Sequence, residues 1–229
     1  MDDNLDIDEL LDDIRGKAFE SMVARKDINY DEVERALPIV EDFILKHNLV
    51  LYGGMGMDMA FQLKGSFIYD PKDDVLPDYD FYSPDPIKHS YELADILHKK
   101  GFKMVNAINA MHITTMRVRI GSDVVADISY IPPNIYRKIP TLEFQKGKKK
   151  FRIINPIFQR IDLHESLTEP FRDPPREVIF NRFRKDIKRL KMLDEMYPIK
   201  VGKYKVPDKV LSIIPVSYTH LTLPTICSV

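Results

Sequence analysis

Three aspartates downstream of a glycine pair are the feature of this sequence that most constrains its fold. The glycines are Gly53 and Gly54, and the aspartates are Asp78, Asp80 and Asp127. Residues i and i+2 of a strand share a face, so Asp78 and Asp80 are expected side by side, and a neighbouring strand can bring Asp127 alongside. Three carboxylates on one face repel one another unless cations hold them, and Mg²⁺ or Mn²⁺ prefers oxygen ligands. The pattern therefore predicts a sheet that carries a divalent-metal site.

The glycine pair predicts the other half of such a site. It stands between a short apolar run, Leu49–Tyr52, and a helical run, Met55–Leu63. A glycine-rich turn from a strand into a helix exposes backbone N–H groups that can hold phosphates. Two metal ions about 4 Å apart suit nucleotidyl transfer, because one polarises the attacking hydroxyl and the other binds the triphosphate. In that scheme Asp78 and Asp80 contact both ions, and Asp127 contacts only the ion that activates the hydroxyl.

Each part of this pattern also has a simpler interpretation. An Asp-x-Asp pair is common in surface loops, and two glycines can form an ordinary tight turn. Phe81 and Tyr82 favour a strand, because they continue the aspartate pair as an apolar segment. Asp127 interrupts an apolar run, and a buried unpaired carboxylate costs several kcal/mol. Asp127 is therefore either a metal ligand or a strand aspartate paired with Arg117 or Arg119.

Charge is unevenly distributed along the chain, although the formal net charge is only −1. Residues 1–40 hold 12 acidic and 5 basic residues, whereas residues 137–191 hold 16 basic and 7 acidic residues. The basic stretch predicts a surface that binds a polyanion, and an ordinary solvated surface is the alternative. If the polyanion is RNA, the candidate contacts to its phosphates, which carry no sequence information, are Lys148, Lys149, Lys150, Arg182, Lys185 and Arg189.

Composition excludes several classes of protein. No run approaches the roughly 18 apolar residues that span a bilayer, and the acidic start is unlike a signal peptide. An intracellular protein without a membrane partner is therefore expected. Cys227 is the only cysteine, which excludes disulfide frameworks and cysteine-based zinc sites.

The order of helical and strand patterns predicts an α/β fold of the α+β type, with a mixed sheet of about five strands and helices on one face. An N-terminal helical segment is expected over residues 1–48, where Pro38 should kink or divide a helix. The predicted catalytic core covers residues 49–140. A basic hairpin and helices over residues 141–215 are expected to form a partial second region.

The individual elements follow from periodicity and turn residues. The predicted strands are Leu49–Tyr52, residues 79–83, Phe102–Val105, Ile113–Ile120, Val124–Ile131, Leu142–Gln145 and Phe151–Ile154. The predicted helices are residues 5–25, a helix after Asp31, Met55–Leu63, and residues 87–100, 156–168 and 176–196. The last helix is expected to bury a stripe of Ile179, Phe183, Ile187 and Leu190.

The last residues are expected to be foreign to the natural protein. Residues 216–225, read back into codons, can encode a common sequencing-library adapter through their whole length. Residues 216–229 are therefore left out of the fold prediction, as a cloning scar would be. The natural chain is accordingly expected to be longer, and a hydrophobic tail strand is the alternative.

Three segments carry a resemblance to a known family: Leu51–Phe61, Leu76–Asp85 and Asp123–Pro140. The most specific motifs are Tyr-Gly-Gly, Pro-Asp-Tyr-Asp-Phe-Tyr-Ser and Ala-Asp-Ile-Ser-Tyr. In these motifs the chain resembles the catalytic subunit of the poly(A) polymerases of large nucleocytoplasmic DNA viruses, within the DNA polymerase beta-like nucleotidyltransferase superfamily. The resemblance spans most of residues 30–200.

The resemblance implies template-independent addition of AMP from ATP to RNA 3′ ends, with two Mg²⁺ or Mn²⁺ ions, in mRNA polyadenylation. It implies that Gly53 and Gly54 lie at the triphosphate, and that the catalytic metal ligands are Asp78, Asp80 and Asp127. It also implies a homodimer or a separate processivity subunit, and a location in a virus factory of the host cytoplasm or in the virion. The C-terminal region with which the family helps to hold nucleotide and RNA is expected to be missing.

Two other functions stay open from the sequence. A nucleotidyltransferase could modify a different acceptor, such as a tRNA end, a protein or a small molecule. A subunit without catalytic activity could keep the fold for RNA binding or dimerisation. The three intact aspartates argue against the second alternative, because a binding module has no reason to concentrate unpaired acid beside phosphate.

Overall fold

The computed structural model describes residues 30–69, 76–168 and 176–199, and the side chains of residues 176–182 are outside that description. The chain divides into two compact units, Met1–Tyr197 and Pro198–Val229, and all helices and strands given below belong to the first. The helix predicted over residues 5–25 and the adapter-like tail over residues 216–229 lie outside the described residues. Within the described part, no helix is long and apolar enough to cross a membrane.

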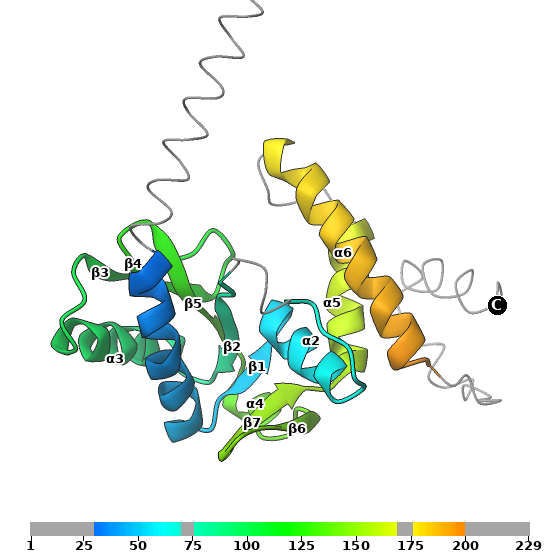
Figure 1. Ribbon diagram of the computed structural model, residues 1–229, viewed down its shortest axis with the longest axis horizontal. Coiled ribbons are helices and arrows are strands. Elements are labelled where there is room, and N and C mark those ends of the chain that lie inside the picture. Colours follow the sequence, from blue (N-terminus) through cyan, green and yellow to red (C-terminus); the bar gives the residue numbers. More distant parts are fainter. Residues whose placement is uncertain (1–29, 70–75, 169–175, 200–229) are drawn as a thin grey trace, which may run out of the picture. The chain divides into compact units, whose positions relative to one another are not determined.

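A mixed sheet of seven strands, in the order β3-β4-β5-β2-β1-β7-β6, forms the centre of the first unit (Figure 1). Strands β2 and β5 pair in parallel, as do β1 and β7, and the other neighbours are antiparallel. The strands are β1 Val50–Tyr52, β2 Tyr79–Ser83, β3 Val105–Asn109, β4 Thr115–Ile120, β5 Asp123–Tyr130, β6 Thr141–Lys146 and β7 Lys149–Ile154. The predicted mixed sheet is confirmed, with seven strands instead of about five.

The two additional strands are those of the basic hairpin. The sequence predicts an exposed hairpin that begins a second region, but β7 pairs with β1 and continues the main sheet. Phe151 and Ile153 alternate along β7, and both are almost fully buried. Burial of these apolar side chains drives the hairpin onto the sheet edge, since a solvated hairpin would leave them in water.

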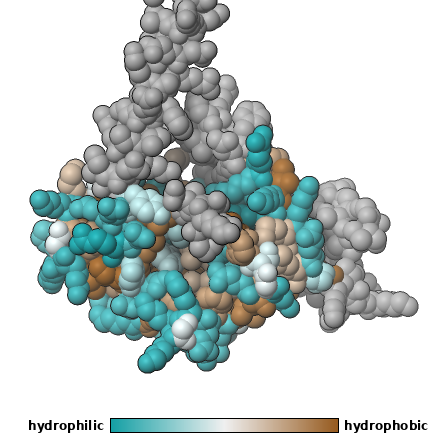
Figure 2. All heavy atoms as spheres, in the orientation of Figure 1, coloured by the Kyte–Doolittle hydropathy of each residue, from teal (hydrophilic) through white to brown (hydrophobic). Residues whose placement is uncertain are grey.

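The helices lie around this sheet. They are a helix over residues 30–46, α2 Gly53–Gln62, α3 Pro86–Lys99, α4 Pro133–Tyr136, α5 Pro156–Thr168 and α6 Arg176–Met196. Figure 1 shows α5 and α6 side by side, and α5 also contacts α2. On the face drawn in Figure 2, much of the described surface is hydrophilic, as expected for a sequence with 30% charged residues.

The helix over residues 30–46 supports the strand that carries the aspartate pair. It runs without interruption past Pro38, where the sequence predicts a kink or a division. Proline costs one helical hydrogen bond, but this helix buries Ala36, Val40 and Phe43 against the sheet, and that packing offsets the loss. Phe43 also contacts Phe81 of β2, with 6.4 Å between the ring centroids.

The predicted strand Phe102–Val105 is wrong by several residues. β3 begins only at Val105, because Gly101 and Met104 both have a positive φ and turn the chain between α3 and β3. Phe102 is buried inside this turn, and the Arg35 guanidinium lies 5.4 Å from its ring centroid. Its apolar side chain is therefore a core contact of the turn and not the start of a strand.

Candidate active site

The glycine pair joins β1 to α2 and lies directly against Asp80. Gly53 has φ +62°, a conformation that L side chains rarely adopt, and a Cβ atom there would overlap the Asp80 carboxylate. The Gly54 backbone N–H donates to Asp80. The sequence-predicted glycines and aspartate are thus brought together, and the close approach explains why Gly53 has no side chain.

Asp80 and Asp127 are neighbours across the parallel strands β2 and β5. They are paired in register, so their side chains share one face, while Tyr79 and Phe81 point to the opposite, buried face. Asp78 lies one residue before β2 and is partly exposed. Burial, followed by the negative charges of Asp78 and Asp127, raises the pKa of Asp80 to about 8. The Gly54 N–H and the charge of Arg189 lower this pKa, but they do not outweigh burial and the two neighbouring carboxylates.

The raised pKa of Asp80 predicts how stability depends on pH in the absence of metal. The folded pKa of about 8 lies above the unfolded value of 3.8, so the folded protein binds the proton more tightly. The contribution of Asp80 to the free energy of unfolding is therefore expected to fall as pH rises from about 4 to about 8. Urea unfolding in EDTA at about pH 6 and about pH 8.5 checks this, and Asp80→Asn should flatten the dependence. An equal slope in both proteins would contradict the assignment.

Asp127 is held by an arginine on the adjacent strand. Arg117 lies directly opposite Asp127 in the register of β4 and β5. Its Nε donates to Oδ1 at 2.8 Å and its Nη2 donates to Oδ2 at 2.7 Å, a bidentate pair. Of the two arginines that the sequence offers as partners, Arg117 is the one that binds Asp127. This pair does not remove Asp127 from the site, because each carboxylate oxygen keeps a second lone pair.

The three carboxylates have the oxygen donors that a divalent cation prefers, but they do not stand close enough together to hold one. Within residues 30–69, 76–168 and 176–199, no three metal-ligating side chains converge closely enough to hold an ion as they stand. Asp78, Asp80 and Asp127 nevertheless form an all-oxygen donor set, the kind that suits Mg²⁺ or Mn²⁺. The unfavourable interaction of Asp80 with the other two carboxylates is what a bound cation would relieve.

A row of hydroxyl groups lies beside these carboxylates and was not predicted from the sequence. The hydroxyl of Tyr52 lies 2.7 Å from that of Ser129, which lies 2.8 Å from that of Thr115. The ring of Tyr52 stacks on that of Tyr82, with centroids 4.0 Å apart. Burial, followed by the charge of Asp80, raises the pKa of Tyr52. Tyr52 therefore stays neutral and forms one wall beside Asp80.

Arg189 reaches the start of α2 from α6, although the sequence places it in an exposed basic surface. It is only 8% exposed, and its Nη2 donates to the Tyr69 hydroxyl at 3.2 Å. The predicted apolar stripe of α6 is wrong in part, because Ile187 is 36% exposed, whereas Arg189 and Leu193 are buried. The spacing of apolar residues alone could not reveal a buried arginine, because its neighbours come from distant segments.

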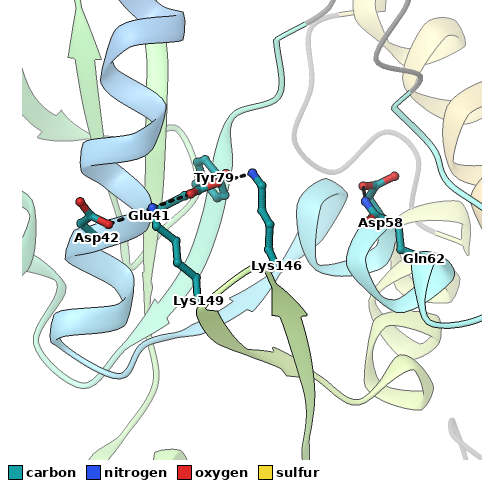
Figure 3. Close-up of polar contacts among 7 residues, drawn as sticks. All are labelled: Glu41, Asp42, Asp58, Gln62, Tyr79, Lys146 and Lys149. Atoms are coloured by element: carbon teal, nitrogen blue, oxygen red, sulfur yellow. Dashed lines mark hydrogen bonds and ion pairs between the residues drawn. The ribbon is translucent and has the colours of Figure 1, made fainter.

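A buried aspartate positions the segment that contacts Arg189. Asp58 of α2 is 2% exposed and accepts the backbone N–H groups of Ile68 and Tyr69 at 2.6 and 3.1 Å. Gln62 Nε2 donates to the other oxygen at 2.6 Å, as Figure 3 shows. Asp58 thus ties residues 68–69 to α2, and so fixes where the Tyr69 hydroxyl lies.

The lysines of the basic hairpin are engaged in ion pairs. Lys149 Nζ lies 2.9 Å from both Glu41 Oε2 and Asp42 Oδ1, and Lys150 Nζ lies 2.7 Å from Glu143 Oε2. These pairs account for two of the charges assigned to RNA from the sequence. Lys148 and Lys185 are exposed, and the side chain of Arg182 falls outside the described part.

Glu41 connects the basic hairpin to Tyr79, the residue between Asp78 and Asp80 (Figure 3). It is 5% exposed and accepts from Tyr79 Oη at 2.7 Å, Lys146 Nζ at 2.7 Å and Lys149 Nζ at 2.9 Å. Burial opposes its ionisation, but these hydrogen bonds outweigh burial and hold the pKa of Glu41 below its usual value. The Tyr79 side chain is therefore anchored from the face opposite the carboxylates.

Glu41→Gln is expected to lower the free energy of unfolding by about 1–2 kcal/mol at neutral pH, because it weakens hydrogen bonds from two partly solvated lysines. Urea unfolding measures the change. Glu143→Gln is the matched control: it removes a carboxylate that pairs with Lys150, but both side chains are more than 60% exposed. That control should cost less than about 0.5 kcal/mol. Equal losses in the two variants would refute the anchoring role of Glu41.

Comparison with solved structures identifies the fold class. The chain is similar to the crystal structure of the Megavirus polyadenylate synthase, with a TM-score of 0.64 and 24% identity over 89% of this chain and 40% of that one. The predicted α/β nucleotidyltransferase fold is thereby confirmed.

Sequence comparison then gives the family. The family model for the poly(A) polymerase catalytic subunit matches residues 38–173, and the chain belongs to this family. It is 44% identical over 193 residues to a protein named as the poly(A) polymerase catalytic subunit of African swine fever virus, and 27% identical over 174 residues to the protein so named in Acanthamoeba polyphaga mimivirus. These matches cover 84% and 74% of this chain, but only 39% and 27% of the relatives.

Proposed function

We propose that this chain carries the catalytic centre of a template-independent polynucleotide adenylyltransferase, which transfers AMP from ATP to RNA 3′ ends. One observation supports this most strongly: Asp80 lies between the charges of Asp78 and Asp127 and also against the Gly53–Gly54 turn. A cation site and a phosphate site are thereby adjacent, which is what transfer of a nucleotidyl group requires.

Asp78, Asp80 and Asp127 would hold two Mg²⁺ or Mn²⁺ ions. When bound, these ions supply Lewis-acid polarisation and neutralise charge on the phosphates. The protein's own groups set the positions of the carboxylates. The Gly54 N–H orients Asp80, and the bidentate guanidinium of Arg117 orients Asp127. Hydrogen bonds to ligating carboxylates of this kind fix their direction and tune the site.

The remaining proposals concern binding partners. The exposed Lys148 and Lys185 are candidates for contacts with the RNA backbone, and Arg182 is a candidate from its place in the basic sequence alone. Lys149 and Lys150 would first have to leave their carboxylate partners. A homodimer or a separate processivity subunit, and activity in a virus factory or virion, are proposed on the family alone.

A 3′-extension assay tests the proposed reaction. The protein is incubated with a labelled RNA, Mg²⁺ and each NTP in turn, and the expected product is a ladder that lengthens with ATP. The double variant Asp78→Ala, Asp80→Ala should form no ladder. If the labelled RNA stays unchanged while a tRNA end, a protein or a small molecule is modified, the proposed RNA 3′-end acceptor is wrong. If the double variant keeps both RNA binding and the function of its complex, the chain is a scaffold and not an enzyme.

A further inference from the structure

Three hydroxyl side chains border the carboxylates, and the proposed reaction does not yet use them. Ser129 follows Asp127 by two residues on β5, so both side chains lie on the same face of the sheet. On β4, Thr115 lies opposite Ser129 as Arg117 lies opposite Asp127. Tyr52 reaches Ser129 from β1, which lies on the other side of β5 in the strand order. The hydroxyl row of Tyr52, Ser129 and Thr115 therefore runs beside Asp127, on the face that carries the carboxylates.

Ser129 stands in the middle of the hydroxyl row and keeps part of its hydrogen-bonding capacity. Its Oγ lies 2.7 Å from Tyr52 Oη and 2.8 Å from Thr115 Oγ1, and the described residues offer the three hydroxyls no other hydrogen bond. A hydroxyl can donate once and accept twice, so two contacts leave Ser129 room for a third. Because either atom of each pair can be the donor, the third contact can use a lone pair or the O–H. Ser129 can therefore pair with a group that both donates and accepts.

Ser129 is accessible to a ligand, whereas its neighbours in the hydroxyl row are held in place. Ser129 is partly exposed, but Thr115 is only 7% exposed. The ring of Tyr52 is stacked on that of Tyr82, whose hydroxyl lies 3.4 Å from Asp162 Oδ2 of α5. These contacts restrict the two side chains that bond to Ser129. Its oxygen is thus positioned before a ligand binds, which lowers the entropy lost on binding.

The strand order separates Ser129 and Thr115 from the Gly53–Gly54 turn. The turn follows β1, Asp80 lies on β2, Asp127 and Ser129 lie on β5, and Thr115 lies farther away on β4. In nucleotidyl transfer the attacking and leaving oxygens stand roughly in line, on opposite sides of the phosphorus. With the phosphates at the glycine turn, the attacking hydroxyl enters on the side of Asp127 and Ser129.

The chemistry of the hydroxyl row fits a sugar hydroxyl. The row supplies no positive charge for a phosphate, whose ionised oxygens only accept hydrogen bonds. A ribose carries its 2′-hydroxyl, which both donates and accepts, on the carbon next to the 3′-hydroxyl that attacks. The 2′-hydroxyl is also the group by which a protein distinguishes RNA from DNA at a given site. A ribose whose 3′-hydroxyl lies at Asp127 can therefore present its 2′-hydroxyl to Ser129.

We propose that Ser129, positioned by Tyr52 and Thr115, hydrogen-bonds the 2′-hydroxyl of the acceptor's 3′-terminal nucleotide and so selects an RNA end over a DNA end. This inference rests on the proposed function and adds the residue that determines which sugar the acceptor carries. Tyr52 and Thr115 are positioning residues, because they act through Ser129. Within the motif Ala-Asp-Ile-Ser-Tyr, Asp127 and Ser129 then serve neighbouring hydroxyls of one sugar.

Extension of two primers with ATP tests this proposal. The primers share one RNA sequence and differ only at the 3′-terminal nucleotide, which carries ribose in one and 2′-deoxyribose in the other. Wild-type protein is expected to prefer the ribose end in kcat/KM. Ser129→Ala should reduce this preference about 3- to 10-fold, as for loss of one hydrogen bond between neutral groups, and should leave the deoxyribose primer unaffected. Ser129→Thr keeps the hydroxyl and should keep most of the preference.

Ser83→Ala is the matched control. Ser83 is also a strand serine with a short hydrogen bond, 2.6 Å from its Oγ to His89 Nδ1, but it is fully buried. It alternates with Asp80 and Tyr82 along β2, so it lies on the opposite face of the sheet. Loss of its hydrogen bond can lower stability, and with it the rate on both primers, but the preference for ribose should stay unchanged.

Equal preference for ribose in wild type and Ser129→Ala would overturn the proposal, as would equal extension of both primers by wild type. If Ser129→Ala does not fold, Tyr52→Phe and Thr115→Val carry the test, and wild-type preference in both would also overturn it.

A wild-type protein that extends neither primer would reject the adenylyltransferase, and fluorescence anisotropy of the same two labelled primers then decides the hydroxyl contact. Tighter binding of the ribose end that is lost in Ser129→Ala would retain this contact. Equal binding of the two ends would overturn it.

Discussion

Asp80→Asn is expected to lower AMP transfer by about a thousandfold or more, because it removes the central carboxylate of the proposed metal site. Metal ions contribute several kcal/mol to stabilising a transition state of this kind, and each 1.36 kcal/mol is a tenfold change in rate. The same substitution is expected to leave the protein folded. Its melting temperature in EDTA at about pH 8.5 should be equal to or above that of wild type, because the amide removes the buried charge, and its repulsion by Asp78 and Asp127, that raise the pKa of Asp80.

Asp95→Asn provides the charge-matched control, since Asp95 is exposed on α3. It should change neither AMP transfer nor melting temperature. The catalytic interpretation would be contradicted if Asp80→Asn kept more than about a tenth of the wild-type rate, which corresponds to less than about 1.4 kcal/mol of transition-state stabilisation. Initial rates at saturating ATP and circular-dichroism melts supply both measurements.

Gly53→Ala is expected to reduce AMP transfer by about a hundredfold or more and to destabilise the fold. The new methyl group would overlap the Asp80 carboxylate, so the carboxylate or the turn must move. A displacement of about 1 Å at a reacting centre can cost on the order of a hundredfold in rate. The alanine would also have to adopt the backbone φ of +62° found at position 53, which adds a cost of about 1 kcal/mol.

Gly147→Ala separates these two effects. Gly147 has φ +60°, nearly the same as Gly53, but no heavy atom lies within 4 Å of the position its Cβ would take. The control should therefore lose about 1 kcal/mol of stability and keep its rate of AMP transfer. Similar rates for the two variants would show that the close approach of Gly53 to Asp80 is not required.

The local part of the site follows from sequence, because it depends on alternation within strands. Asp80 and Asp127 each interrupt an apolar strand, and the side-chain period of two places Asp80 opposite Tyr79 and Phe81, and Asp127 opposite Ala126 and Ile128. The glycine pair identifies the turn, since a close backbone approach is the usual reason for two glycines between a strand and a helix. Only the structure shows that the atom approached is the Asp80 carboxylate.

The long-range part could not be predicted in this way. Arg189 and Tyr69 are 120 residues apart, and no periodicity links them. Lys149 belongs to a basic run typical of a polyanion surface, yet Glu41, more than a hundred residues earlier, binds it. The pairing of β7 with β1 is equally invisible, because an alternating strand fits any sheet edge that offers an apolar face.

The proposed function requires that Asp80 and its neighbouring carboxylates form a divalent-metal site next to bound phosphates. Electron paramagnetic resonance of Mn²⁺ titrated into the protein, with and without ATP, measures this directly. Mn²⁺ is expected to bind wild-type protein, to bind more tightly when ATP is present, and to bind at least tenfold more weakly to Asp80→Asn, equivalent to about 1.4 kcal/mol or more. Equal Mn²⁺ binding by wild type and Asp80→Asn, with no effect of ATP, would contradict it.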